Sequence, residues 1–153
     1  MGWGVVRQDG NRLRYVQHGA ITTPSDWEMP RRLGRLFDGV TELVRGYRPE
    51  TMAIEELFFN TNVTTAITVG QARGVALLAA YKAGIEVTEY TPLQVKQAVT
   101  SYGRADKRQV QEMVKALLNL PAVPRPDDAA DGLAIAICHA FSSNLPGKVG
   151  VGK

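Results

Sequence analysis

The segment 127–142 is the strongest constraint on the fold, because it is a run of helical length with almost no polar face. Beyond its acidic start it reads GLAIAICHAF, and a helix that is apolar on nearly every side is stable only when other elements bury it. The chain must therefore supply a sheet or further helices that enclose this one. A length of 153 residues is sufficient for one domain with such a core.

The composition is that of an ordinary globular protein, with 44% hydrophobic and 22% charged residues. A formal charge of +3 fits either an acidic partner or simple solubility, and the charge alone does not decide between them. The single cysteine, Cys138, excludes an internal disulfide and is predicted to be a buried, inert thiol. We find no uninterrupted apolar run near the roughly 18 residues of a membrane span and no secretory signal, so we expect a cytoplasmic protein.

The order of predicted elements indicates an α/β sheet with helices on both faces. Asp9-Gly10-Asn11 is a hairpin turn signal between two strand-like runs, 2–8 and 12–22. We expect one domain over 1–145 and a flexible tail over 146–153. The other expected elements are a helix containing Leu33 to Val44, a strand at 51–55, a helix at 64–83 ended by Gly84, a strand at 85–90, a helix at 92–100, a helix capped by Asp106, and the helix 127–142.

Carboxylates occur at two places where acid is costly to bury. Glu55 ends an apolar strand, and the C-terminal ends of parallel strands are where ligands bind in such sheets. Glu55 also fits a carboxylate that marks the point where the strand emerges into solvent. Asp128 and Asp131 lie three residues apart on one face of the apolar helix, where they repel each other unless a cation lies between them. Oxygen ligands favour Mg²⁺ or Mn²⁺. Asp127 fits a helix N-cap, and His139 lies too far along the helix to join the set, so we expect it to be structural.

Four blocks of sequence resemble the RuvC crossover-junction endonucleases in wording and in order: MAIEELFF, GQARGVALLAA, QVKQAV and DDAADGLAIAICHAF. The resemblance extends from Gly2 to about Phe141. It implies a ribonuclease H-like mixed sheet flanked by helices, and a homodimer that resolves four-way (Holliday) junctions in DNA recombination and repair. It also implies that Glu55, Asp128 and Asp131 are catalytic and hold two Mg²⁺ or Mn²⁺ ions, which activate a water for attack on the phosphodiester. A branch-migration helicase complex is a further implied partner.

The chain departs from the family pattern at its start. Family members open with an apolar strand ending in Asp-Pro-Gly, whose Asp is a metal ligand, whereas this chain opens at the following strand, Gly2-Trp3-Gly4-Val5-Val6. By resemblance, the missing central strand lies between strands 2–8 and 51–55. We therefore expect two unpaired inner sheet edges, poor folding unless the gap is closed or filled from another molecule, and slow cleavage.

The resemblance also implies which residues contact DNA. Lys96 and Lys107 match basic positions used near the scissile phosphate, with Lys107 counted as catalytic as well, and Arg104 adds charge to the same region. Phe58 is the candidate for stacking on an unpaired base. Each lysine also fits a merely solvated side chain, and Phe58 also fits a residue packed under its loop.

The helix 64–83 has small or apolar residues around most of its circumference, so it can pack on the sheet and also face a twin in a homodimer. Ala79 is a candidate contact with the twin, and a helix buried within one chain is the competing explanation. Two other functions stay open: a junction-binding protein without catalysis, and a ribonuclease H-like enzyme acting on a different nucleic acid. The DDAAD block and the adjacent phenylalanines favour the junction endonuclease.

Overall fold

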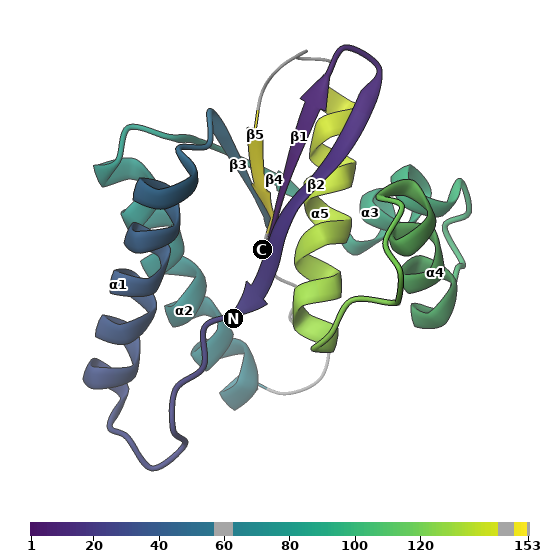
Figure 1. Cartoon of the computed structure of the whole chain (residues 1–153). Coiled ribbons are helices and arrows are strands. Elements are labelled where there is room, and N and C mark those ends of the chain that lie inside the picture. Colours follow the sequence, from purple (N-terminus) through teal and green to yellow (C-terminus); the bar gives the residue numbers. More distant parts are fainter. Residues whose placement is uncertain (57–62, 144–148, 153) are drawn as a thin grey trace.

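The chain folds into one five-stranded sheet with helices on both faces (Figure 1). The computed structural model describes residues 1–56, 63–143 and 149–152. The strand order is β2-β1-β5-β3-β4, so the fold is a mixed α/β sheet as predicted. The elements are β1 (Gly2–Asp9), β2 (Arg12–Ala20), α1 (Met29–Tyr47), β3 (Thr51–Glu55), α2 (Val63–Lys82), β4 (Glu86–Tyr90), α3 (Pro92–Thr100), α4 (Lys107–Leu117), α5 (Asp127–Ser143) and β5 (Val149–Gly152).

Local signals in the sequence account for most of the element boundaries. The hairpin closes where Asp9 pairs with Arg12, and Gly10 between them has a φ of +62°. Asp106 accepts a hydrogen bond from the Gln109 N–H in a capping box that starts α4. Gly84 follows α2 with a φ of +74°, a conformation that glycine adopts without strain.

Two hydrophobic clusters lie on opposite faces of the sheet. Because alternate residues of a strand point to opposite faces, Val5 packs in the cluster under α1 and α2, and Val6 packs in the cluster under α5. Figure 1 shows α1 and α2 on one side of the sheet and α5, α3 and α4 on the other. α5 is buried along almost its whole length, as its composition predicts. Cys138 is buried there, and the burial raises the pKa of its thiol.

The gap predicted between the first and third strands is filled by β5 from the same chain. β5 runs antiparallel to β1, opposite residues 4–7, and parallel to β3, opposite residues 51–53. The predicted flexible tail over 146–153 is therefore wrong for Val149–Gly152, and its other residues lie outside the described ones. The physical reason is that two facing strand edges offer unpaired N–H and C=O groups, which a short extended segment can satisfy on both sides.

Candidate nuclease site

Glu55 is held at the end of β3 by contacts of its backbone. β3 is buried up to Ile54 and emerges at Glu55, where the side chain reaches solvent. The Arg73 side chain on α2 donates a hydrogen bond from Nε to the Glu55 carbonyl at 3.3 Å, and it also forms an ion pair with Glu89 on β4. The residue is thus fixed by two elements besides its own strand.

Asp128 and Asp131 are placed by an unusually close approach of α5 to β1. A Cβ added at Gly2 would lie 2.0 Å from the Asp128 carbonyl oxygen, and one added at Gly132 would lie 2.7 Å from the Trp3 backbone. Only glycine allows such proximity between a helix and a strand. The opening run Gly2-Trp3-Gly4 is visible in the sequence, but nothing local to it predicts a contact with α5.

One pocket brings the three predicted carboxylates together. It has a volume of about 470 Å³, and Glu55, Asp128 and Asp131 all line it, together with Thr23 and Arg32. The Arg32 Nε donates a hydrogen bond to the Thr23 hydroxyl at 3.0 Å. Carboxylates from β3 and α5 therefore line one cleft together with residues of α1 and α2.

An adjoining pocket of about 210 Å³ adds the two predicted lysines. Lys96 on α3 and Lys107 on α4 line this pocket together with Glu55 and Asp131, which belong to both pockets. Arg104 is exposed on the loop between α3 and α4 and lines neither of these two pockets. The structure thus brings five of the predicted site residues to one place.

The charges around α5 are strongly coupled. The protein packed around Asp131 removes part of its hydration and raises its pKa, an effect opposed by Lys107 and reinforced by Asp128, although the side chain still reaches solvent. The pKa of Lys107 is raised, first by its hydrogen bond to Asp127 and then by the charge of Asp131. Hydrogen bonds from Lys107 and Arg125 lower the pKa of Asp127.

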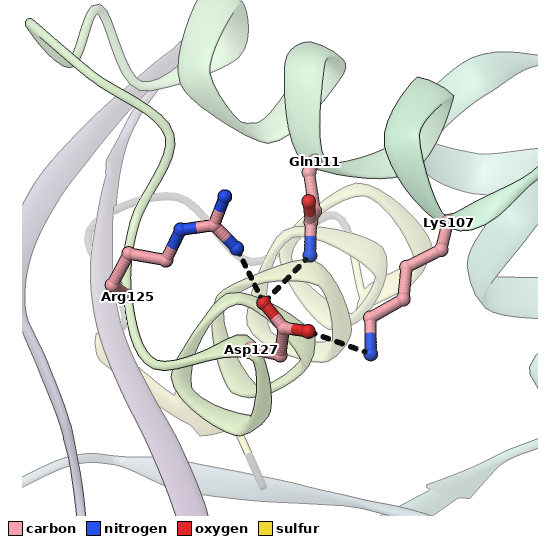
Figure 2. A network of polar contacts seen from close by, with 4 residues as sticks. All are labelled: Lys107, Gln111, Arg125 and Asp127. Atoms are coloured by element: carbon pink, nitrogen blue, oxygen red, sulfur yellow. Dashed lines mark hydrogen bonds and ion pairs between the residues drawn. The ribbon is translucent and has the colours of Figure 1, made fainter.

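Asp127 does not act as the N-cap of α5, which corrects the sequence prediction. α5 begins at Asp127 itself, and the Pro126 carbonyl accepts the backbone N–H groups of Ala129 and Ala130. Figure 2 shows the Asp127 carboxylate among Lys107, Gln111 and Arg125 instead. The N-cap prediction rested on the neighbours of Asp127 alone, and no local signal pairs this residue with Gln111 or Lys107 on α4.

Two other predicted residues lie outside this cluster. His139 is buried in the core and shares hydrogen bonds with the Thr51 hydroxyl (3.0 Å) and the Tyr90 hydroxyl (2.7 Å), a geometry consistent with its predicted structural role. Phe58, the predicted stacking residue, lies outside the described residues.

The donor set of the site suits a hard divalent cation. Three carboxylates without cysteine or histidine are the ligands that Mg²⁺ and Mn²⁺ prefer. Within the residues 1–56, 63–143 and 149–152, no three acidic, histidine or cysteine side chains form a compact cage ready for a metal. The carboxylates share a pocket at wider spacing, so a cation held by Glu55, Asp128 and Asp131 requires their side chains to converge on it.

Known proteins share this fold and this sequence. A crossover junction endodeoxyribonuclease RuvC from Rubrobacter xylanophilus is 82% identical over 153 residues, which is 100% of this chain and 86% of that protein. Another, from Chloroflexus aggregans, is 59% identical over 99% of this chain and 92% of its own length. Both relatives extend over the whole of the site described above.

Solved structures agree with these sequence matches. The structure of Thermus thermophilus RuvC has a TM-score of 0.87 and 39% identity, over 97% of this chain and 92% of that one. T. thermophilus RuvC in complex with Holliday junction substrate has a TM-score of 0.89 and 39% identity, over 97% and 91%. Residues 1–139 match the family model described as crossover junction endodeoxyribonuclease RuvC. The chain therefore belongs to the RuvC family of crossover junction endodeoxyribonucleases.

Proposed function

We propose that this chain is an endonuclease that recognises four-way DNA junctions and hydrolyses phosphodiesters in two symmetric strands with the help of Mg²⁺. The observation that carries the proposal is the pair of adjoining pockets, in which Glu55 and Asp131 face both a further carboxylate and two lysines. A related protein of the same fold is known in complex with Holliday junction substrate. Acidic and basic groups in one cleft suit a reaction on a phosphate held beside metal ions.

The acidic residues supply the metal-holding part of this proposal. Bound Mg²⁺ would activate the attacking water and stabilise the leaving oxygen. Glu55 extends from the end of a buried strand, while Asp128 and Asp131 extend from the first turns of a buried helix, so all three are anchored on regular secondary structure. A cation among them also offsets the cost of the partly desolvated Asp131 charge. Two ions per site, as the family resemblance implies, remain a proposal.

The basic residues supply the phosphate-binding part. Lys96 and Lys107 reach the pocket from two different helices, so they can contact the DNA backbone beside Glu55 and Asp131. Arg104 on the neighbouring loop extends the basic surface, and Phe58 is proposed to stack on a junction base. A complex with a branch-migration helicase rests on the resemblance, and a cytoplasmic location rests on the sequence pattern described above. Both remain predictions.

A second candidate function is junction binding without cleavage. The absence of a compact three-residue metal cage among the described residues is the observation that favours it. The two functions differ in one assay, in which labelled four-way junction and linear duplex are titrated with protein in Mg²⁺ and in EDTA. Cutting of the junction in Mg²⁺ alone supports the endonuclease, and tight junction binding without cutting supports the alternative.

Lys96→Ala and Lys107→Ala are expected to weaken junction binding and to flatten its dependence on salt. Each phosphate contact adds about 0.9 to the slope of log affinity against log salt, so each variant should lose a slope of about one. Fluorescence anisotropy with labelled junction, from low to moderate salt, measures both the affinity and the slope.

Lys82→Ala serves as the matched control, because Lys82 is an exposed lysine at the end of α2 and lines neither pocket. Its slope should equal that of the parent chain. Equal affinity of the parent for junction and for linear duplex would refute junction recognition.

We further propose that the chain is a homodimer formed through α2. The helix exposes large apolar side chains on one stripe, with exposed fractions of 56% for Ile67, 51% for Leu78 and 80% for Tyr81. Gly74 lies on the same stripe, and a Cβ there would meet nothing within 4 Å, so its own chain does not require glycine. By length and composition alone, this helix could also cross a membrane. A second copy of the chain would cover its exposed apolar stripe equally well.

Ala79 is not part of this stripe, which corrects the sequence prediction. It is 2% exposed and packs in the core cluster between α1 and the sheet, because it lies on the inner face of α2. A charge at Ala79 would disrupt the fold of one chain instead of the contact between two.

Leu78→Glu is instead expected to give folded monomers, because a desolvated charge at the contact opposes association. Sedimentation velocity at micromolar concentration measures the change, with the thermal midpoint as the test of folding. Leu93→Glu is the control, since Leu93 on α3 is 53% exposed but lies away from α2. A parent chain that sediments as a monomer would refute the dimer.

A further inference from the structure

The carboxylate of Asp127 binds three donors from two other segments. Its Oδ1 accepts hydrogen bonds from the Arg125 guanidinium at 2.6 Å and from the Gln111 Nε2 at 3.4 Å. Its Oδ2 lies 3.3 Å from the Lys107 Nζ. In Figure 2 the two oxygens are directed accordingly, one toward Arg125 and Gln111 and the other toward Lys107. One oxygen is therefore anchored, and the other is left to face the lysine.

Stability alone does not account for this arrangement. The Pro126 carbonyl accepts the backbone N–H groups of Ala129 and Ala130, and Asp127 lies inside α5 and not at its cap position. The side chains of Asp127 and Lys107 are 47% and 57% exposed, and exposed ion pairs add little to the free energy of unfolding. The carboxylate also accepts a hydrogen bond from the buried Gln111, which a surface ion pair does not need.

The partner of this carboxylate is a residue of the proposed nuclease site. Lys107 lines a pocket together with Glu55 and Asp131, and the charges of Asp131 and Asp128 both act on its amine. A lysine has a long, flexible stem, and two unshielded carboxylates close by attract it. Without another partner, the amine would settle on the oxygens that the proposed function needs for a cation.

We propose that Asp127 is a positioning residue that holds Lys107 beside Asp128 and Asp131 and keeps its amine off their carboxylates. The inference rests on the proposed function, in which Lys107 contacts the phosphate and the two aspartates hold Mg²⁺. Holding the amine in advance reduces the motion needed when the phosphate arrives, and it leaves the aspartate oxygens available to the cation. Asp127 touches neither reacting group itself.

The test compares Asp127→Asn with the parent chain in two assays. In the first, surface amines are acetylated and the Lys107 peptide is quantified by mass spectrometry, in the absence of DNA. Loss of the carboxylate should increase the labelling rate of Lys107 several-fold, because a paired ammonium is protected. In the second, cleavage of a four-way junction is followed at varied Mg²⁺. The variant should show a kcat about tenfold lower and a several-fold higher half-saturating Mg²⁺, with junction affinity within twofold.

Three further variants isolate the effect. In a Lys107→Ala background the same Asp127→Asn change should alter neither kcat nor the Mg²⁺ requirement by more than about twofold, because Asp127 acts through the lysine. Asp127→Glu retains the charge and should recover most of both. Asp9→Asn is the matched control, since Asp9 pairs with Arg14 in the hairpin and is 45% exposed.

The outcomes separate this proposal from the proposed function. Unchanged labelling of Lys107 in Asp127→Asn would overturn the positioning role, as would an equal loss of kcat in the Lys107→Ala background. Tighter junction binding with faster cleavage would also overturn it, because Asp127 would then compete with the phosphate. A parent chain that binds but does not cut the junction would overturn the nuclease function, while the labelling still decides whether Asp127 holds Lys107.

Discussion

Asp131→Asn is expected to reduce Mg²⁺-dependent cleavage of a four-way junction by more than about 100-fold, since even the groups that only support metal ligands are commonly worth 10- to 100-fold. Asp131, like Glu55, lines both pockets, so it faces both the proposed cation site and the two lysines. Junction binding in EDTA should be unchanged or tighter, because the variant removes a negative charge that faces the phosphate. The loss of cleavage activity is measured under single-turnover conditions, with enzyme in excess over junction, and under multiple-turnover conditions.

A second readout does not depend on cleavage. Mg²⁺ that binds the folded chain raises its thermal midpoint, and this rise should disappear in Asp131→Asn. Asp38→Asn is the control, because Asp38 is an exposed acid on α1 that lines neither pocket. If the variant keeps both the Mg²⁺-dependent rise and the cleavage rate, Asp131 is not a metal ligand.

Gly132→Ala is expected to destabilise the protein and to impair the site together. The added Cβ would lie 2.7 Å from the Trp3 Cα and 2.9 Å from the Gly4 nitrogen, both of which are backbone atoms that cannot turn aside. Overpacking of this kind costs about 1–3 kcal/mol, and a chain of this size loses roughly 2–4 °C of melting temperature per kcal/mol. Because α5 must move away from β1, Asp128 and Asp131 move with it, and cleavage should decrease as well.

Gly34→Ala provides the matched comparison within another helix. Gly34 lies in α1, and a Cβ there would meet nothing within 4 Å, so the higher helix propensity of alanine should stabilise the chain by up to about 1 kcal/mol. Differential scanning calorimetry on both variants measures the contrast. A Gly132→Ala variant as stable as Gly34→Ala would mean that α5 and β1 do not require this close approach.

Much of the fold could be predicted because its signals are local. The strand 51–55 and the helix 92–100 begin and end where predicted. The signal for the strand is an apolar run that ends in a charge, and the signal for the helix is its Thr-Pro start. Each of these signals lies within a few consecutive residues. The burial of α5 also followed from composition alone, because no polar face was available for solvent. The grouping of Glu55 with Asp128 and Asp131 came from the family resemblance and agrees with the pocket that they line.

Features that depend on contacts between distant segments could not be predicted in the same way. The assignment of Asp127 as a cap was reasonable from its neighbours, but its actual partners lie on α4 and on the connector before α5. The inner position of Ala79 depends on the rotation of α2, which a helix apolar on most sides does not reveal. The pairing of β5 depends on a vacancy in the sheet, a property of the folded neighbours and not of the segment itself.

The position of β5 has a consequence for the geometry of the acidic cluster. β5 lies between β1 and β3 in the sheet. The helix α5 packs mainly on β1, on one side of β5, and β3 lies on the other side. Glu55 therefore belongs to one half of the molecule, and Asp128 and Asp131 belong to the other. Strands in a sheet lie about 4.8 Å apart, so the one strand between β1 and β3 sets their separation at two such spacings. The segment between β1 and β3 therefore acts as a spacer for the acidic residues. A change of even one ångström in the distance between these two strands is on the scale that alters reaction rates.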